Sequence, residues 1–166
     1  MTKPIRLWIC STHHTAFRCG GWASVRSLDG QLTGAAGGER NTTAARMALA
    51  GLAAGLADLP TLKASQAPQT IAMETNSPAL AAFSTILATL AATSDNAPEA
   101  DLDLWARIIT GAKARRVALT LVRIKPETAI AFVAAWADLA MDRGKTRGAF
   151  AMAIPRINLA RMPGVN

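Results

Sequence analysis

The sequence predicts an α/β protein in which a mixed five-stranded sheet, with three antiparallel strands followed by two parallel ones, is flanked by helices. Three strand-forming segments precede residue 37, and Asp29-Gly30 between the last two is a strong hairpin signal. Helical and strand patterns then alternate along the rest of the chain. With 166 residues, 51% of them hydrophobic, the chain is long enough to bury one core without disulfide cross-links.

The first three strands are predicted from alternating apolar positions and strand-forming residue types. They cover residues 5–10, 21–26 and 31–36. Residues 11–18 are polar and predict a loop, and Gly37-Gly38 is expected to end the third strand.

The first helix is predicted to run to about residue 57, with Asn41 or Thr42 as its cap. Gly51 and Gly55 lie four residues apart on it and would allow close packing against a sheet. Apolar residues at helical spacing mark its buried side: Met47, Leu49, Leu52 and Leu56.

The second half of the chain alternates between the two patterns. A short buried strand is predicted at 70–73, and Asn76-Ser77-Pro78 is a compact start for a helix reaching about residue 92. A polar loop at 94–101 precedes a helix at 103–113 and a strand at 117–124. Pro126-Glu127 opens the last helix, which is expected to end near Gly144.

The formal net charge of +7 is unevenly distributed. Residues 1–142 hold 13 basic and 11 acidic residues, and we expect them to form the folded domain. Residues 143–166 are expected to form a basic, partly apolar C-terminal tail. That tail suggests contacts with phosphates or another acidic partner, while the alternative is a solubility feature of an Ala/Arg-rich chain. Its cations, which no acid accompanies, are Arg143, Lys145, Arg147, Arg156 and Arg161.

Composition excludes several classes of protein. The hydrophobic content argues against disorder, and two cysteines do not make a disulfide scaffold. The longest uncharged run, residues 75–94, contains Pro78 and several Ser and Thr, and its apolar residues are largely alanine, so we expect no membrane span. Arg18 interrupts the only stretch that a signal peptide could use. We therefore expect a soluble cytoplasmic protein.

Five short motifs appear in the order and at nearly the spacing of one known family. They are Gly20-Gly21-Trp22-Ala23, the helix start from Thr42 to Leu49 with Arg46-Met47, Glu74-Thr75-Asn76-Ser77, Asp103-Leu104-Trp105, and Ala137-Asp138-Leu139-Ala140. Over residues 5–143 the chain thereby resembles ribonuclease H, the type I branch of the ribonuclease H-like superfamily. The resemblance implies a ribonuclease H-like fold.

The resemblance also implies a two-metal centre in which four carboxylates hold Mg²⁺ ions that cleave the RNA strand of an RNA/DNA hybrid. This sequence has no carboxylate at the matching positions, which are Cys10, Ala48, Asn76 and Ala137. Mg²⁺ needs carboxylate charge, so we expect two-metal hydrolysis to be lost. The substitutes that an altered alignment would offer are Glu39, Glu74 and Asp138.

Residues of three regions are candidates for nucleic-acid contact. The resemblance assigns Thr42, Thr43 and Arg46 at the first helix start to the sugar-phosphate backbone, although helix capping explains the two threonines as well, and Arg46 could instead pair with a carbonyl or an acid. The other candidates are His13 and His14 in the first loop and Arg143, Lys145 and Arg147 in the tail.

Four residues have side chains that suit zinc. Cys10, His13, His14 and Cys19 have the spacing Cys-x2-His-His-x4-Cys across one strand-loop-strand segment. The alternative is two packed cysteines with two surface histidines.

These observations lead to one main hypothesis and two alternatives. We expect a catalytically degenerate ribonuclease H-like protein that needs no cofactor and binds RNA/DNA hybrid or duplex weakly and without sequence preference, or acts as an interaction module. The first alternative is an active hybrid endonuclease that uses Mg²⁺ or Mn²⁺ and relocated carboxylates. The second is an oligomerising scaffold that presents the apolar residues 150–155 to another chain.

Overall fold

A computed structural model describes residues 5–57, 59–61, 63, 65–83, 98–121 and 128–165. Parts of several sequence predictions lie outside these residues. They are positions 84–92 of the second predicted helix, 94–97 of the polar loop, 122–124 of the last predicted strand, and the helix start at Pro126-Glu127.

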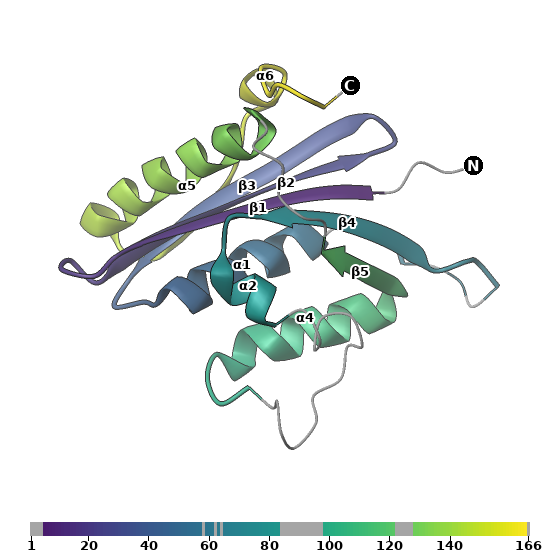
Figure 1. Ribbon diagram of the computed structural model, residues 1–166, viewed down its shortest axis with the longest axis horizontal. Coiled ribbons are helices and arrows are strands. Elements are labelled where there is room, and N and C mark those ends of the chain that lie inside the picture. Colours follow the sequence, from purple (N-terminus) through teal and green to yellow (C-terminus); the bar gives the residue numbers. More distant parts are fainter. Residues whose placement is uncertain are drawn as a thin grey trace.

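The sheet is mixed, with the strand order β5-β4-β1-β2-β3-β6 (Figure 1). In the order β1-β2-β3-β6 each strand is antiparallel to the next, while β4 is parallel to both β1 and β5. The predicted two-residue hairpin is confirmed, since Asp29 and Gly30 both have positive φ angles between β2 and β3. The strands are β1 (Ile5–His14), β2 (Cys19–Leu28), β3 (Gln31–Arg40), β4 (Gln69–Thr75), β5 (Val117–Leu121) and β6 (Phe150–Ala153).

Helices cover both faces of the sheet (Figure 1). One face carries α1 (Ala44–Leu56), α2 (Pro78–Ala82) and α4 (Leu102–Ala114), and the other carries α5 (Thr128–Arg147). The short α6 (Arg156–Leu159) contacts β3 near the C-terminus.

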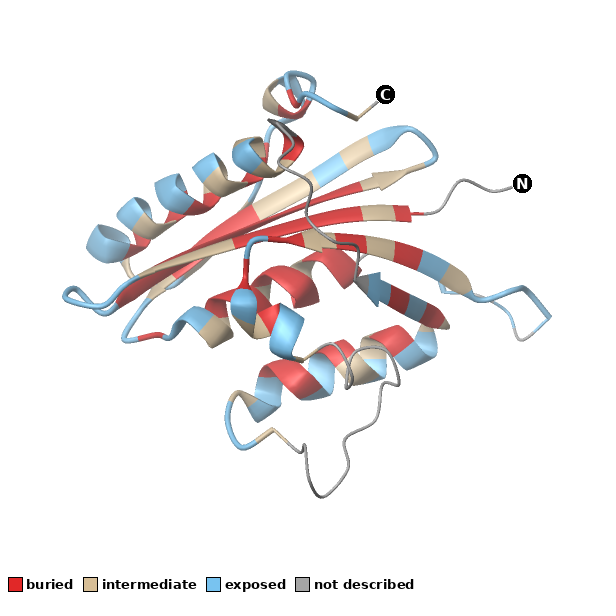
Figure 2. Cartoon of the chain, viewed as in Figure 1, coloured by how far each residue is buried: buried red, intermediate tan, exposed pale blue. Residues whose placement is uncertain are grey.

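Strand alternation divides the core into two clusters. On β1, Leu7 and Ile9 pack beneath α1 and α4, whereas Trp8 and Cys10 pack beneath α5. Figure 2 shows the buried residues of α5 along the side of the helix that faces the sheet. The predicted packing at Gly51 and Gly55 is confirmed, because a Cβ there would lie 2.8 Å from Ile9 and 2.6 Å from Leu7, respectively.

The predicted count of five strands is wrong, because β6 adds a sixth at the edge beyond β3. This strand belongs to the segment expected to form a tail. Residues 143–147 complete α5, Phe150–Ala153 pairs with β3 of the same chain, and Ile154 and Leu159 are buried. Ile154 and Leu159 of this segment are therefore used within the chain's own core, whereas Ile157 is exposed.

Two local predictions also need correction. Residues 11–14, expected in a loop, continue β1 because they pair with the start of β2. Gly37-Gly38 does not end the third strand. The two glycines lie within it because neither position has room for a side chain. A Cβ on Gly37 would meet the indole of Trp22, and one on Gly38 would lie 2.6 Å from the carbonyl oxygen of Ala140 in α5.

The helix starts follow capping rules. The predicted helix start at Asn76-Ser77-Pro78 is confirmed: Ser77 caps α2, its hydroxyl accepting a hydrogen bond from the Leu80 amide, with Pro78 in the first turn. The cap of α1 is Thr43 rather than Asn41 or Thr42, and its hydroxyl accepts from the Arg46 amide at 3.1 Å. Within the described residues, no helix combines the length and hydrophobicity needed to cross a bilayer.

Candidate functional site

Two of the four positions that the resemblance assigns to carboxylates lie side by side, Cys10 on β1 and Asn76 directly after β4. Ile9 pairs with Thr75 in the parallel register, which places Cys10 and Asn76 next along their strands. The exposed Asn76 side chain continues this pairing. Its Oδ1 accepts from the Ser11 amide at 3.1 Å, and its Nδ2 donates to the Ser11 carbonyl at 3.5 Å. Asn76 thus acts as an extension of the β1–β4 ladder.

Cys10 is a buried neutral thiol. Its side chain is fully inaccessible, and its Sγ donates to the carbonyl oxygen of Ile130 in α5 at 3.5 Å. The pKa of Cys10 is raised to about 12, mainly by burial; a hydrogen bond with the Asn76 backbone opposes this rise, and the negative charge of Asp138 adds to it. A protonated thiol is a poor ligand for a hard cation.

The raised pKa of Cys10 predicts a loss of stability in alkali. The unfolded chain releases the thiol proton from about pH 9, whereas the folded chain keeps it until about pH 12. Above pH 9 the unfolded state therefore binds fewer protons, and this group lowers the free energy of unfolding by up to about 1.4 kcal/mol per pH unit. Urea unfolding of the wild type and Cys10→Ala between pH 8 and about pH 10.5 measures the effect. Parallel pH profiles for the two proteins would contradict the assignment.

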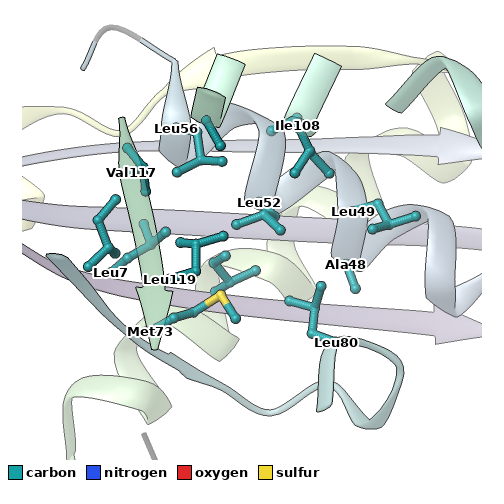
Figure 3. Close-up of a cluster of buried hydrophobic side chains, with 14 of the residues drawn as sticks. Leu7, Ala48, Leu49, Leu52, Leu56, Met73, Leu80, Ile108, Val117 and Leu119 are labelled. Atoms are coloured by element: carbon teal, nitrogen blue, oxygen red, sulfur yellow. The ribbon is translucent and has the colours of Figure 1, made fainter. Parts of the chain in front are cut away.

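The other two positions hold methyl groups on opposite faces of the sheet. Ala48 of α1 is fully buried in the cluster beneath α1 and α4, where Figure 3 shows it close to Leu49 and Leu80. Ala137 of α5 is buried in the cluster beneath α5. Neither position offers a ligand atom, and both are sealed by apolar packing.

The predicted substitutes do not rebuild a carboxylate cluster. Glu74 forms an ion pair with Arg6 at 3.4 Å, and Glu39 forms one with Arg46 at 3.1 Å. Asp138 lies exposed on α5. Within the part of the chain that the structure describes, no group of three or more His, Cys, Asp or Glu side chains is arranged to hold a metal ion.

Arg46 is the centre of an ion-pair network at the start of α1. Its guanidinium lies 3.1 Å from carboxylate oxygens of Glu39, Asp101 and Asp103. Hydrogen bonding to Asp103 is the main cause that raises the pKa of Arg46, and the same bond lowers the pKa of Asp103. The sequence left open whether Arg46 pairs with a backbone carbonyl or with an acid, and the structure shows pairing with acids. The network ties the end of β3 and the start of α4 to α1.

The two threonines beside Arg46 serve the helix start. Thr43 caps α1, and Thr42 is buried, its backbone carbonyl 3.0 Å from Nε2 of His13. Within the described residues, the Thr42 hydroxyl has no hydrogen-bond partner. The helix start is therefore a packed junction.

Several solved structures have a fold similar to that of this chain. The N-terminal RNase H domain of a Mycobacterium tuberculosis protein is 16% identical, with a TM-score of 0.57, covering 84% of this chain and 94% of that chain. RNase H1 from Halobacterium salinarum is 17% identical, with a TM-score of 0.52 and coverages of 85% and 99%. LC11-RNase H1, solved with an RNA/DNA hybrid, is 14% identical, with a TM-score of 0.59 and coverages of 84% and 98%.

The chain has the ribonuclease H-like fold. This finding confirms the predicted fold class, with the sixth strand as its one difference. No protein-family model and no curated protein matches the sequence.

In this ribonuclease H-like chain, the residues present do not fit the divalent metal ions that the resemblance implies. The four positions supply one neutral thiol, one amide already bonded to β1, and two buried methyl groups. Mg²⁺ dehydrates reluctantly and needs carboxylate oxygens in octahedral geometry. We therefore derive no hydrolytic step through a metal at these positions.

The four residues of the zinc alternative are not brought together. Cys10 bonds to Ile130, His13 lies against Thr42, and His14 Nδ1 accepts from the Phe17 amide at 3.3 Å. Cys10 and His13 are an odd number of residues apart on β1, so their side chains leave opposite faces of the strand. Cys19, the partner of His14 in the β1–β2 register, is buried, whereas His14 is exposed.

A second candidate surface lies where the β1–β2 hairpin, the end of β3 and the C-terminus of α5 meet. Arg40 at the end of β3 donates to the carbonyl oxygens of Lys145 and Thr146, at 2.9 and 2.6 Å. Lys145 Nζ lies 3.5 Å from the centre of the Phe17 ring. We call this the hairpin-end surface, and it comprises His14, Phe17, Arg18, Arg40, Lys145 and Arg147.

Three residues of the predicted nucleic-acid set lie on the hairpin-end surface, namely His14, Lys145 and Arg147. Arg143 lies one helical turn earlier, with Nη1 3.1 Å from the sulfur of Met152. Phe17, Arg18 and Arg40 were not among the residues predicted to contact nucleic acid. An aromatic residue next to a cation within a polar segment was the signal available for the first two, and no local signal identified Arg40.

Proposed function

We propose that the chain is a ribonuclease H-like protein that binds nucleic acid without cleaving it. The observation that carries the proposal is the state of the four carboxylate positions. Three are sealed in the core as Cys10, Ala48 and Ala137, and the fourth, Asn76, is bonded to the β1 backbone. Apolar or neutral residues at these four positions do not supply the negative charge needed to hold two Mg²⁺ ions.

Binding is supported by the fold and by charge. LC11-RNase H1 was solved with an RNA/DNA hybrid, and a foamy viral protease-reverse transcriptase with the same fold was solved with dsDNA. The net charge of this chain is +7, which favours a polyanionic partner. Contacts made by lysine and arginine with phosphates do not depend on sequence and weaken with salt.

The test combines a cleavage assay with a binding assay. With a labelled RNA/DNA hybrid, we expect no cleavage product in Mg²⁺ or Mn²⁺, and we expect binding that weakens steeply between about 50 and 200 mM salt. Binding is measured by fluorescence anisotropy and cleavage on a denaturing gel.

Metal-dependent cleavage would overturn the proposal. If cleavage were then lost in a Glu39→Gln, Glu74→Gln, Asp138→Asn triple variant, the enzyme alternative with relocated carboxylates would stand instead. A protein that binds neither hybrid nor single strands at low salt would exclude the nucleic-acid function.

A further inference from the structure

The hairpin-end surface presents an aromatic ring that the core does not use. Phe17 lies in the turn between β1 and β2, and the residue is 57% exposed. The turn is held in place, since the Phe17 amide donates to His14 Nδ1 and the Arg18 carbonyl accepts from the Thr42 amide at 3.3 Å. The rings of His14 and Phe17 also pack, with centroids 4.7 Å apart. The turn therefore holds an exposed ring in a fixed position, with the Lys145 ammonium over it.

The cations around this ring have no acidic partner among the described residues. Arg18, Arg40, Lys145 and Arg147 are exposed, and none of them forms an ion pair with a described carboxylate. Arg6 and Arg46 differ, because carboxylates neutralise both. The exposed carboxylate of Asp142 is on the same helix as Lys145 and Arg147. The surface therefore keeps an excess of positive charge.

Separate elements fix the relative positions of these groups. Cys19 pairs with Arg40, which brings the end of β3 beside the hairpin, and Arg40 in turn bonds the last carbonyls of α5. Lys145, from the last turn of α5, reaches over Phe17. Figure 1 shows the hairpin and the C-terminal end of α5 at the same end of the molecule. The cations are thus held around the ring, and a base that stacks on the face covered by Lys145 displaces that flexible side chain towards the phosphates.

We infer that the hairpin-end surface binds single-stranded nucleic acid, with an unpaired base stacked on Phe17 and phosphates held by Arg18, Arg40, Lys145 and Arg147. The inference rests on the proposed function and narrows it to one surface and one form of ligand. An exposed aromatic ring stacks on a base only where that base is not already stacked in a duplex. The positive charges account for attraction to the backbone without sequence readout.

The same chemistry would suit an anionic lipid surface, but the exposed apolar residues argue against it. The other large hydrophobic side chains exposed in the described residues are Leu102, Leu139 and Ile157, on α4, the middle of α5 and α6. Phe17 therefore has no apolar neighbours of this size on the hairpin-end surface. Interfacial binding needs a broader apolar face than one ring supplies.

Two variants and a matched control test the inference by fluorescence anisotropy on a labelled single-stranded oligothymidine and on an RNA/DNA hybrid of the same length. Phe17→Leu keeps an apolar side chain but removes the ring, and we expect it to weaken single-strand binding about tenfold. Lys145→Gln with Arg147→Gln is expected to reduce the slope of log affinity against log salt by about 1.4, since each phosphate contact on a single strand contributes about 0.7. The control, Arg156→Gln with Arg161→Gln, removes the same charge from exposed positions on and just after α6 and should leave single-strand binding near the wild-type value.

The outcomes separate this inference from the proposed function. Equal losses in the control and in the Lys145/Arg147 variant, or unchanged single-strand binding in Phe17→Leu, would overturn the inference while hybrid binding still supported the function. Wild-type protein that binds neither probe would overturn both. Variants that lose binding to phosphatidylserine vesicles but not to oligothymidine would assign the surface to lipid and overturn the inference. A thermal unfolding midpoint equal to that of the wild type shows that each variant is folded.

Discussion

Replacing Gly21 by alanine is expected to lower the free energy of unfolding by about 3 kcal/mol or more. Gly21 lies on β2 directly beneath α5. A Cβ at this position would lie against the carbonyl oxygen of Ala137 and 2.5 Å from the amide nitrogen of Met141. Both are backbone atoms, so no side-chain rotation relieves the overlap and the helix must move away from the sheet. Urea unfolding monitored by circular dichroism measures the loss.

Gly111→Ala is the matched control for this experiment, because it adds the same methyl group at another glycine. Gly111 lies inside α4, where a Cβ would lie 3.1 Å from Nη1 of Arg115, the far end of a flexible side chain. Alanine is a better helix former than glycine, so we expect this variant to gain about 0.5 to 1 kcal/mol. If both variants were equally stable, the close approach of α5 to β2 would be wrong.

Cys10→Asp is the second substitution with a large expected effect, a loss of about 3 kcal/mol or more at neutral pH. Although aspartate is the residue that the family resemblance expects there, the site no longer suits it. The side chain is fully buried, it faces the carbonyl oxygen of Ile130, and Asp138 is close enough to act on its charge. The loss should shrink as pH falls towards about 4, because burial raises the pKa of the introduced carboxyl and the protonated acid carries no charge.

Cys10→Ala and Mn²⁺ make this test specific. The alanine variant removes the thiol without adding charge, so we expect it to lose much less stability than the aspartate variant. Mn²⁺ should leave the unfolding midpoint of Cys10→Asp unchanged, because Ala48, Asn76 and Ala137 add no carboxylate. A Mn²⁺-dependent rise in the midpoint of Cys10→Asp alone would show that one carboxylate restores metal binding and would contradict our description of the site.

The fold was predictable from local patterns where neighbouring residues determine it. The Asp29-Gly30 turn and the Ser77 cap are short-range signals, and both were read correctly. Strand β6 was not predicted, because four residues of alternating character look the same in a tail as in a strand. Only its pairing with β3, from the other end of the chain, makes it a strand. Gly37-Gly38 was misread for a related reason, since the groups that exclude side chains there, Trp22 at Gly37 and Ala140 of α5 at Gly38, are remote in sequence.

For the candidate sites too, the sequence predicted the local features but not those that depend on tertiary packing. The positions of Cys10, Ala48, Asn76 and Ala137 followed from motif order, but their burial depends on helices packed from both sides. Arg46 was recognised as a charged residue at a helix start, yet two of its three partners, Asp101 and Asp103, come from a distant helix start. The hairpin-end surface could not be predicted because Phe17 and Lys145 meet only after α5 has docked.

The antiparallel pairing of β3 with β6 has a consequence for synthesis of the protein. Strand β3 is complete at residue 40, but its outer edge is covered only when Phe150–Ala153 has been made. Until then, the nascent chain exposes a strand edge containing Gly34, Ala35, Ala36, Gly37 and Gly38, without a charged side chain among them. Unprotected edges of this kind pair readily with other chains. The edge of the sheet is thus closed only when residues 150–153 have been made, and β6 acts as the chain's own protection against aggregation.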